Sequence, residues 1–400
     1  MSIFLNVIAL MFYVVAIYLF LNVLYLLFFA IVGHRKLMPL VAKHDANILR
    51  MCVMLPAYRA DDVILQTAPL AKKHLYKGEV DVYVIADGLQ PATILALQNN
   101  QVGVIEVFFE KSTKGKPMVS ALETLPQDMY DVAVILDVDN VMADGFLDHV
   151  NNAFSNGYRV VQGHRTAKNL DSPFAILDTC NEEINNHIFR QGHASIGLSA
   201  ALIGSGMAFE YRYLKELLCN IGDTPGEDKE IDFRIVRNKI KIGYLPYAIV
   251  YDEKIPNSKA FTNQRTRWIA VQLEFLKKYI WEGPVQLMNG NFDFFDKVLQ
   301  TLLVPRILLL GLLSVILVLS LSGVPLGPSS QFWVSLLIGT GLALLLSLPK
   351  RLYNRKVVGA IWHLPLALFA MVTALFQLKK AKDSFLPTPH SPTGVKLPQP

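Results

Sequence analysis

The sequence predicts an α/β domain with a mostly parallel sheet, flanked by hydrophobic segments that are long enough to cross a membrane. Three observations lead to this prediction. Between residues 49 and 250, short β-rich apolar runs alternate with helix-like stretches. Polar side chains follow several of these runs directly. Residues 3–32 and 301–378 are almost entirely apolar, and a membrane span needs about 20 such residues.

Composition limits the classes of function. Of the 400 residues, 52% are hydrophobic and 18% are charged, and the net charge is +5. The positive residues form no basic stripe with interleaved aromatic residues, which argues against nucleic-acid binding as a function. The three cysteines are far apart and show no zinc-binding spacing, which fits a reducing compartment better than a disulfide scaffold.

The first apolar segment predicts a retained membrane anchor over residues 1–33. It is too long for the core of a cleaved signal peptide and has no basic residue before it. The basic residues Arg35 and Lys36 follow it directly. Because positive residues mark the cytoplasmic side, we expect the middle of the chain to lie in the cytosol. The protein is therefore expected to be integral to the plasma (inner) membrane.

The C-terminal apolar region, residues 301–378, predicts two spans, Thr301–Ser322 and Phe332–Leu348, with no Lys or Arg in the loop between them. A third segment, Val357–Leu378, is either a span or a re-entrant segment. A span would place the basic residues that follow it outside, so re-entry fits the charges better.

Two further segments flank these spans. Residues 269–300 predict amphipathic helices at the membrane surface. The Pro-rich tail, residues 379–400, is expected to lack regular structure.

Five apolar runs of the middle domain predict strands: Met51–Leu55, Val80–Ala86, Val104–Phe109, Val132–Leu136 and Arg159–Gln162. Polar groups follow four of them, namely Tyr58, Asp87, the pair Lys111 and Lys114, and the pair Asp137 and Asp139. Ligands of open α/β sheets bind at the carboxyl ends of the strands, so this pattern predicts a nucleotide site there.

Asp137 and Asp139 come directly after a buried strand. In extended chain, residues two apart point the same way, so both carboxylates can face one site. Two such oxygen donors can hold Mg²⁺ or Mn²⁺, which would neutralise a diphosphate. The alternative is a strand end with exposed acids.

Two other polar segments have both a structural and a functional interpretation. Asp87 precedes glycine, which favours a turn, but its carboxylate can also accept hydrogen bonds from a base or a ribose. The segment Lys111–Lys116 is either a solvated loop or a phosphate-binding loop.

Glu227 and Asp228 open a predicted helix that runs to Arg237. Acids in a first turn stabilise the helix dipole, which is one interpretation. The other is that Asp228 acts as a general base and takes a proton from an acceptor hydroxyl.

The segment Gln264–Trp268 is the most specific motif of the chain. Arg267 can bind a diphosphate in bidentate fashion, and Trp268 offers a flat apolar face to a sugar ring. The alternative is an amphipathic helix with a tryptophan at the membrane surface.

Taken together and in order, these motifs resemble those of family 2 glycosyltransferases. This group of inverting membrane enzymes includes cellulose, chitin, hyaluronan and poly-N-acetylglucosamine synthases, and ceramide glucosyltransferases are similar. The resemblance runs from about Met51 to Leu276. It rests on Pro56–Tyr58, Ala86 to Thr93, Lys114–Lys116, Asp137–Asp139, Gly204–Met207, Glu227 and Asp228 with Asp232 and Arg234, and Gln264–Trp268.

The resemblance implies a GT-A fold, Rossmann-like with a mostly parallel sheet, for a cytosolic domain over residues 49–268. It implies that the donor is bound by Pro56, Ala57, Tyr58, Asp87, Lys116, Asp137, Gln264 and Arg267, with uridine next to Pro56, Ala57 and Asp87. It implies that Asp137 and Asp139 hold the metal, with Asp139 the more direct ligand, and that Asp228 is the catalytic base. It places Trp268, Gly204, Ser205, Gly206 and Glu227 on the acceptor side.

The implied reaction transfers a hexose or N-acetylhexosamine from a UDP-sugar, with Mg²⁺ or Mn²⁺, to a growing polysaccharide in β-linkage. Transfer of a single sugar to a membrane lipid is the alternative, and a non-catalytic membrane scaffold is a more remote one. An export or accessory subunit is left open. The sequence departs from the family pattern at Ala60, where an acid is frequent, and at Arg59, where asparagine is frequent.

Overall fold

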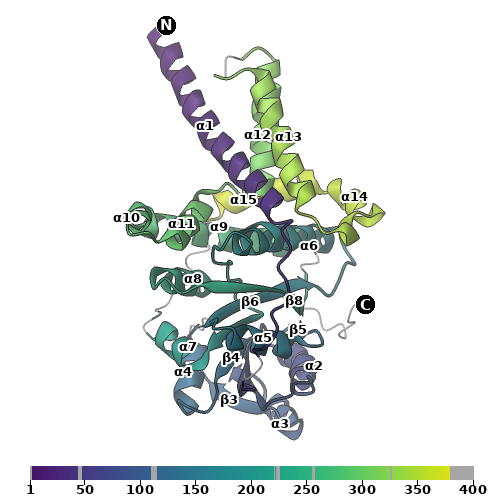
Figure 1. Cartoon of the computed structure of the whole chain (residues 1–400). Coiled ribbons are helices and arrows are strands. Elements are labelled where there is room, and N and C mark those ends of the chain that lie inside the picture. The colour runs from purple at the N-terminus through teal and green to yellow at the C-terminus, as the bar shows by residue number, and fades with distance from the viewer. Residues whose placement is uncertain are drawn as a thin grey trace.

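The chain forms three layers in the computed structural model, which describes residues 2–43, 47–109, 115–219, 221, 226–254, 257–324 and 327–378. A sheet with its covering helices forms one end, a layer of helices lies across it, and three helices project away from that layer (Figure 1). The predicted tail at 379–400, and Lys111 and Lys114 of the basic loop, lie outside the described residues.

The sheet has eight strands in the order β3-β2-β1-β4-β7-β6-β8-β5. Four of the seven pairings are parallel, and the three antiparallel ones involve β7 or β5, two short strands that the sequence analysis did not include. The strands are β1 (Met51–Tyr58), β2 (Val80–Asp87), β3 (Gly103–Val107), β4 (Val132–Ile135), β5 (Val141–Met142), β6 (Val160–Ala167), β7 (Met207–Glu210) and β8 (Ile242–Asp252).

Helices cover both faces of the sheet, and each face has its own apolar core. One face packs against α2 (Asp61–Lys72), α3 (Pro91–Asn99) and α5 (Phe146–Ser155). The other packs against α4 (Gly115–Thr124), α7 (Tyr211–Leu218) and α8 (Glu227–Arg237). The two cores hold the parallel strands rigidly, so their carboxyl ends are fixed relative to one another.

We call the middle layer the platform: α6 (Pro173–Asn185), the π-helix η1 (Asn186–Gly192), α9 (Ser258–Tyr279), α10 (Glu282–Met288), α11 (Phe292–Leu302), the 3-10 helix η2 (Lys350–Leu352), α14 (Arg355–Ile361) and α15 (Leu364–Phe376). A side chain at Gly226 would approach Val271 of α9 to 2.5 Å, so the start of α8 lies directly against the platform. The platform therefore contacts the same region as the predicted catalytic residues.

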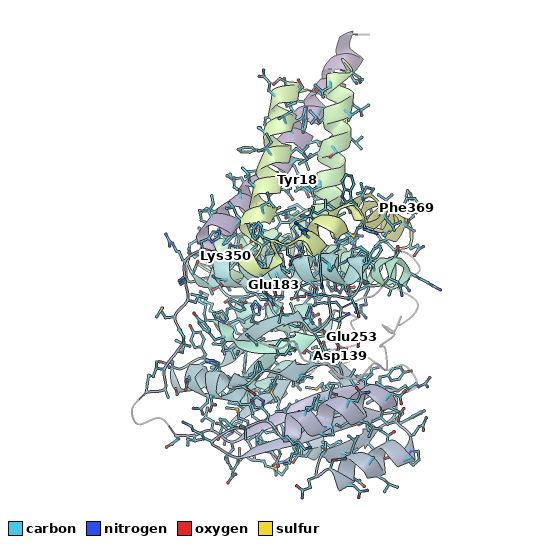
Figure 2. The ribbon with its side chains drawn as sticks, turned by 90° about the vertical axis from the view of Figure 1, so that its right-hand side faces the viewer. Tyr18, Asp139, Glu183, Glu253, Lys350 and Phe369 are labelled. Carbon is cyan, nitrogen blue, oxygen red and sulfur yellow. The ribbon has the colours of Figure 1, made fainter. Side chains whose placement is uncertain are left out.

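Three helices project from the platform: α1 (Ser2–Val32), α12 (Arg306–Leu321) and α13 (Ser330–Leu346). Of the described helices, α1 alone is long and apolar enough to cross a membrane by itself. Two bent pairs pass the same test if each counts as one span, namely α11 with α12 (52°) and α14 with α15 (51°). The predicted segment Val357–Leu378 thus corresponds to the bent pair α14 and α15, which belongs to the platform; Figure 2 labels Phe369 of α15.

Candidate active site at the carboxyl edge of the sheet

The two aspartates after β4 are held by loops from two other strands. The backbone N–H of Asp137 donates to Ser205 Oγ at 2.8 Å. Asp139 Oδ2 accepts from the backbone N–H of Glu253 at 2.9 Å, and Figure 2 shows these two residues together below the platform. Asp139 is 3% exposed, whereas the side chain of Asp137 is 34% exposed. Each carboxylate oxygen has more than one lone pair, so these bonds leave capacity for a cation.

The predicted Gly-Ser-Gly stretch lies beside these aspartates. Gly204 and Gly206 have φ values of +80° and +63°, which a residue with a side chain rarely adopts. This backbone places Ser205, which is fully buried, where its hydroxyl donates to Asn140 Oδ1. The structure therefore brings together two motifs that lie more than 60 residues apart in the sequence.

A group of buried charged residues connects the aspartates to the platform, and we call it the charged layer. Arg165 of β6 donates to Glu182 of α6 at 2.9 Å and lies 3.7 Å from Asp137 and 3.6 Å from Asp252. Lys254 donates to Asp252 at 2.7 Å. The members of the charged layer are Arg165, Glu182, Arg190, Asp252 and Lys254.

Opposite charges decide the ionisation of the charged layer. Burial alone would raise the pKa of Glu182, but Arg165, Lys254 and Arg190 together lower it well below its usual range. Burial would also lower the pKa of Lys254, but Asp252 and Glu182 raise it. The charged layer is therefore ionised at neutral pH, and Asn140 connects it to the motif by donating to both Asp139 and Asp252.

The predicted donor residues at the ends of β1 and β2 are neighbours. In the parallel register, Pro56 pairs with Ile85, Ala57 with Ala86, and Tyr58 with Asp87. Asp87 is 2% exposed. The structure thus places Pro56–Tyr58 and Asp87 side by side on one part of the carboxyl edge.

The starts of α4 and α8 meet at the same edge. A side chain at Gly115 would lie only 3.0 Å from the carboxyl carbon of Glu227. Lys116 is the next residue of α4, and Asp228 is the next residue of α8. Asp228 Oδ1 accepts from the backbone N–H of Lys229 at 2.9 Å.

The Gln264–Trp268 segment lies within α9, at the border between the sheet and the platform. Arg265 is buried, donates to Asp178 Oδ1 of α6, and faces the Trp268 ring at 4.3 Å. Gln264 Oε1 is buried and accepts no hydrogen bond from the part of the chain that the structure describes. One face of Trp268 is therefore occupied by an arginine that the sequence analysis did not single out.

Comparison with known protein families identifies the family to which this chain belongs. Residues 50–270 match the family model described as "Glycosyltransferase like family 2". The chain belongs to this glycosyltransferase family. It is 25% identical over 278 residues to the probable glycosyltransferase YdaM of Bacillus subtilis (strain 168). The match covers 64% of each protein, so the chain spans less than two thirds of the length of that relative.

A solved structure supports the fold. The mannosyltransferase PcManGT from Pyrobaculum calidifontis, determined in complex with GDP-Man and Mn²⁺, superposes with a TM-score of 0.55 at 15% sequence identity. The match covers 95% of this chain and 100% of that one. The predicted GT-A fold and the predicted transferase class are confirmed.

The described residues of this family 2 enzyme could hold a metal ion only together with ligands from a bound substrate. In the described ranges, no group of three or more His, Cys, Asp or Glu side chains is arranged to hold an ion. Asp137 and Asp139 offer two carboxylates at the carboxyl edge after β4. A divalent cation there would need further oxygen ligands, which a diphosphate can supply.

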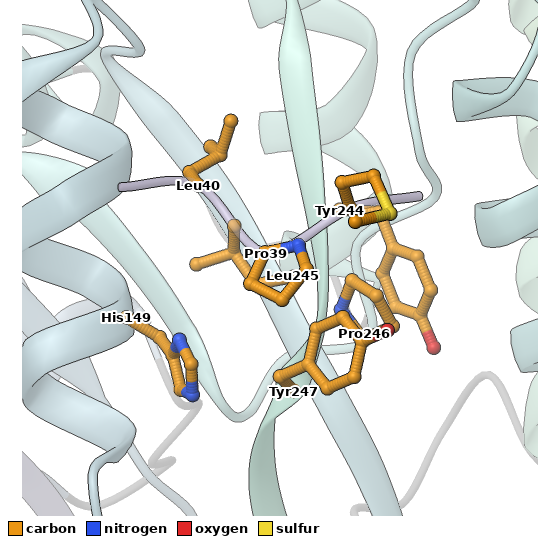
Figure 3. Close-up of a pocket in the computed structure, with 8 residues that line it drawn as sticks. Pro39, Leu40, His149, Tyr244, Leu245, Pro246 and Tyr247 are labelled. Carbon is orange, nitrogen blue, oxygen red and sulfur yellow. The ribbon is translucent and has the colours of Figure 1, made fainter. Parts of the chain in front are cut away.

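Two hollows of the glycosyltransferase domain lie away from this edge. A cavity of about 20 Å³, room for one water molecule, lies between Met38–Leu40, His149 and Tyr244–Tyr247 (Figure 3). A hollow of about 510 Å³ at the other end of the sheet is lined by three arginines, each of which is paired with an acid: Arg50 with Asp131, Arg159 with Glu210, and Arg212 with Asp128. None of the predicted site residues lines either hollow.

Sequence reasoning missed Arg165, Asp252, Lys254 and Arg265. Each is a charged residue that the structure buries. Arg165 follows the predicted strand Arg159–Gln162, which in the structure runs on to Ala167. A charged residue within a buried strand was the signal that could have revealed it.

Proposed function

We propose that this family 2 glycosyltransferase transfers a hexose or N-acetylhexosamine from a UDP-sugar to a growing polysaccharide and forms a β-linkage. The observation that carries the proposal is that the predicted site residues lie together in the fold. Asp137 and Asp139 after β4, Ser205 before β7, and the starts of α4 and α8 all lie at one edge of the sheet. This is the edge at which open α/β sheets bind their ligands.

The donor would bind across the ends of β1, β2 and β4. Pro56, Ala57, Tyr58 and Asp87 would contact the nucleoside, and Lys116, Gln264 and Arg267 would contact the diphosphate. Asp137 and Asp139 would hold Mg²⁺ or Mn²⁺, with Asp139 as the more direct ligand. The bound cation would offset the negative charge of the diphosphate. The structural neighbour solved with GDP-Man and Mn²⁺ supports a metal-bound nucleotide-sugar.

Asp228 would act as the general base. It would take the proton of an acceptor hydroxyl, whose oxygen attacks the anomeric carbon from the face opposite the diphosphate. The bond from that carbon to the diphosphate oxygen breaks, and the configuration inverts. Lys116 and Arg267 would stabilise the charge that develops on the leaving diphosphate. Trp268, Gly204, Ser205, Gly206 and Glu227 would lie on the acceptor side.

We also propose a membrane arrangement in which α1, α12 and α13 cross the inner membrane. The domain over residues 49–268 lies in the cytosol, the helices of residues 269–300 lie at the membrane surface, and the bent pair α14–α15 re-enters. In the C-terminal region 301–378, the basic loop at Lys350 and Arg351 would face the cytosol, which agrees with the distribution of positive charge. The lipid bilayer is thus a partner in this arrangement.

Transfer of one sugar to a membrane lipid is the second candidate. One described helix is long and apolar enough to cross a membrane by itself, and up to three candidate spans result if each bent pair counts as one. Few spans leave little protein for a polymer channel, which favours a lipid acceptor. A non-catalytic scaffold is the remaining alternative and would incorporate no sugar.

The test replaces the proposed base. Asp228→Asn removes the proton acceptor at nearly constant size, and we expect incorporation of labelled sugar from a UDP-sugar to fall by roughly 10²- to 10⁴-fold. UDP binding should change little. Asp144→Asn, at an exposed acid, is the matched control.

Product size separates the two candidates. A ladder or a polymer of high mass indicates a synthase, and one organic-extractable glycolipid indicates the lipid acceptor. Near-normal turnover in Asp228→Asn would rule out Asp228 as the base.

A further inference from the structure

Arg59, the residue after β1, has a backbone conformation that arginine rarely adopts. Its φ is +48°, and a left-handed residue other than glycine costs about 1–2 kcal/mol. The backbone N–H of Arg59 donates to the carbonyl oxygen of Asp87 at 3.0 Å. The conformation is therefore fixed by the neighbouring strand, and strain of this kind is concentrated at functional sites.

The fixed backbone directs the Arg59 side chain along the loop that follows β2. A side chain at Gly88 would lie 3.3 Å from Arg59 Cγ and 3.5 Å from Nε, so glycine there leaves room for the arginine. Asp61 accepts from the backbone N–H of Gln90 at 2.8 Å, which ties the two loops together. Arg59 thus borders the proposed nucleoside pocket, next to the paired residues Tyr58 and Asp87.

The guanidinium of Arg59 has donors that are available to a ligand. Its charged carbon lies 5.1 Å from the centre of the Tyr58 ring, and the side chain is exposed. Within the described ranges it forms no ion pair, whereas Arg50, Arg159 and Arg165 each pair with a carboxylate. Arginine donors in a fixed fork are suited to two adjacent acceptors.

We propose that Arg59 sets the nucleobase preference of the donor pocket and admits guanosine diphosphate beside uridine diphosphate. The inference rests on the proposed function, because it assumes that Asp87 faces the base. A carboxylate accepts from the ring N–H of uracil and from N1–H and the amino group of guanine. An arginine can donate to both O6 and N7 of guanine, whereas uracil offers the fork a single carbonyl on that side. Cytosine and adenine lack the ring N–H.

The experiment measures binding of UDP, GDP, CDP and ADP to the full-length protein in detergent with Mn²⁺, by calorimetry. We expect the unmodified protein to bind GDP within about tenfold of UDP, and both more tightly than CDP and ADP. In Arg59→Asn, the GDP affinity should fall relative to UDP by about 5- to 150-fold, since one bidentate contact to guanine has that value.

The variant is expected to fold, because asparagine tolerates the left-handed conformation better than arginine does. Lys239→Asn is the matched control, at an exposed left-handed residue (φ +55°) between α8 and β8. It should leave all four affinities unchanged.

Three results would overturn the inference. A GDP-to-UDP ratio that is the same in Arg59→Asn and in the unmodified protein shows that Arg59 does not read the base. An equal loss for all nucleotides shows that Arg59 contacts the diphosphate. If the unmodified protein binds no nucleoside diphosphate, the proposed function is wrong, and the inference about Arg59 is wrong with it. The first two results, in contrast, contradict only the inference about Arg59.

Discussion

The sheet is packed against apolar side chains around β1 and β4, and against buried charged side chains around β6 and the end of β8. Around β1 and β4, residues Met51–Leu55 and Val132–Ile135 are buried among apolar side chains. Between β6, the end of β8 and α6, the interior is the charged layer. Apolar burial stabilises a fold directly, whereas buried charges lose hydration that their pairing only partly restores. Since the charged layer contributes little net stability, we infer that it orients Asp137 and Asp139.

The largest expected effect comes from unbalancing the charged layer. Glu182 contacts Arg165, Arg190 and Lys254, so Glu182→Gln leaves three buried cations with too few anions. We expect the free energy of unfolding in detergent to fall by about 3–5 kcal/mol. Glu216→Gln, at an exposed acid of α7, should have almost no effect. Equal stability of the two variants would show that Glu182 does not balance the layer.

A smaller effect is expected from changing the shape of one cation while keeping its charge. Arg165→Lys loses the fork that contacts Glu182, Asp137 and Asp252 together. Residues that hold metal ligands in place typically change metal affinity or activity by about 10- to 100-fold when replaced. We therefore expect Mn²⁺ affinity, measured by titration with UDP present, to fall by that amount.

The control for Arg165→Lys is Arg50→Lys, whose ion pair with Asp131 lies on the surface at the other end of the sheet. It should keep the Mn²⁺ affinity of the unmodified protein. If Arg165→Lys lowers thermal stability but leaves Mn²⁺ affinity unchanged, Arg165 has a purely structural role. That result would contradict its proposed role in positioning the aspartates.

The same contrast explains how much the sequence predicted. The apolar half was predictable because continuous apolar runs followed by polar residues identify buried parallel strands: the run Val132–Leu136 corresponds to β4 (Val132–Ile135), and Asp137 follows it. The short antiparallel strand β7 has only four residues, Met207–Glu210, and no periodicity to mark it. Its place between β4 and β6 is fixed by tertiary packing alone.

The candidate site was predictable only in part. Motifs such as Asp137–Asp139 and Gly204–Gly206 are local, and their spacing can be seen in the sequence. The charged layer joins β6, α6 and the end of β8, and single charged residues such as Arg165 carry no local pattern that identifies their partners. A long-range ion pair depends on the fold, so sequence reasoning alone could not find it.

The smallest effect should come from the apolar half. Ile85 of β2 is fully buried, and Ile85→Val removes one methylene from its core. We expect a loss of about 1 kcal/mol in unfolding free energy and unchanged Mn²⁺ affinity and turnover. Ile105→Val on the edge strand β3, where the side chain is only partly buried, should cost less. Reduced turnover in Ile85→Val would mean that the apolar core also positions the site, because Asp87, two residues further along β2, would then respond to the packing of Ile85. In that case the apolar core around β1 and β4 would not act on stability alone, and the charged layer would not be the only part that orients the site.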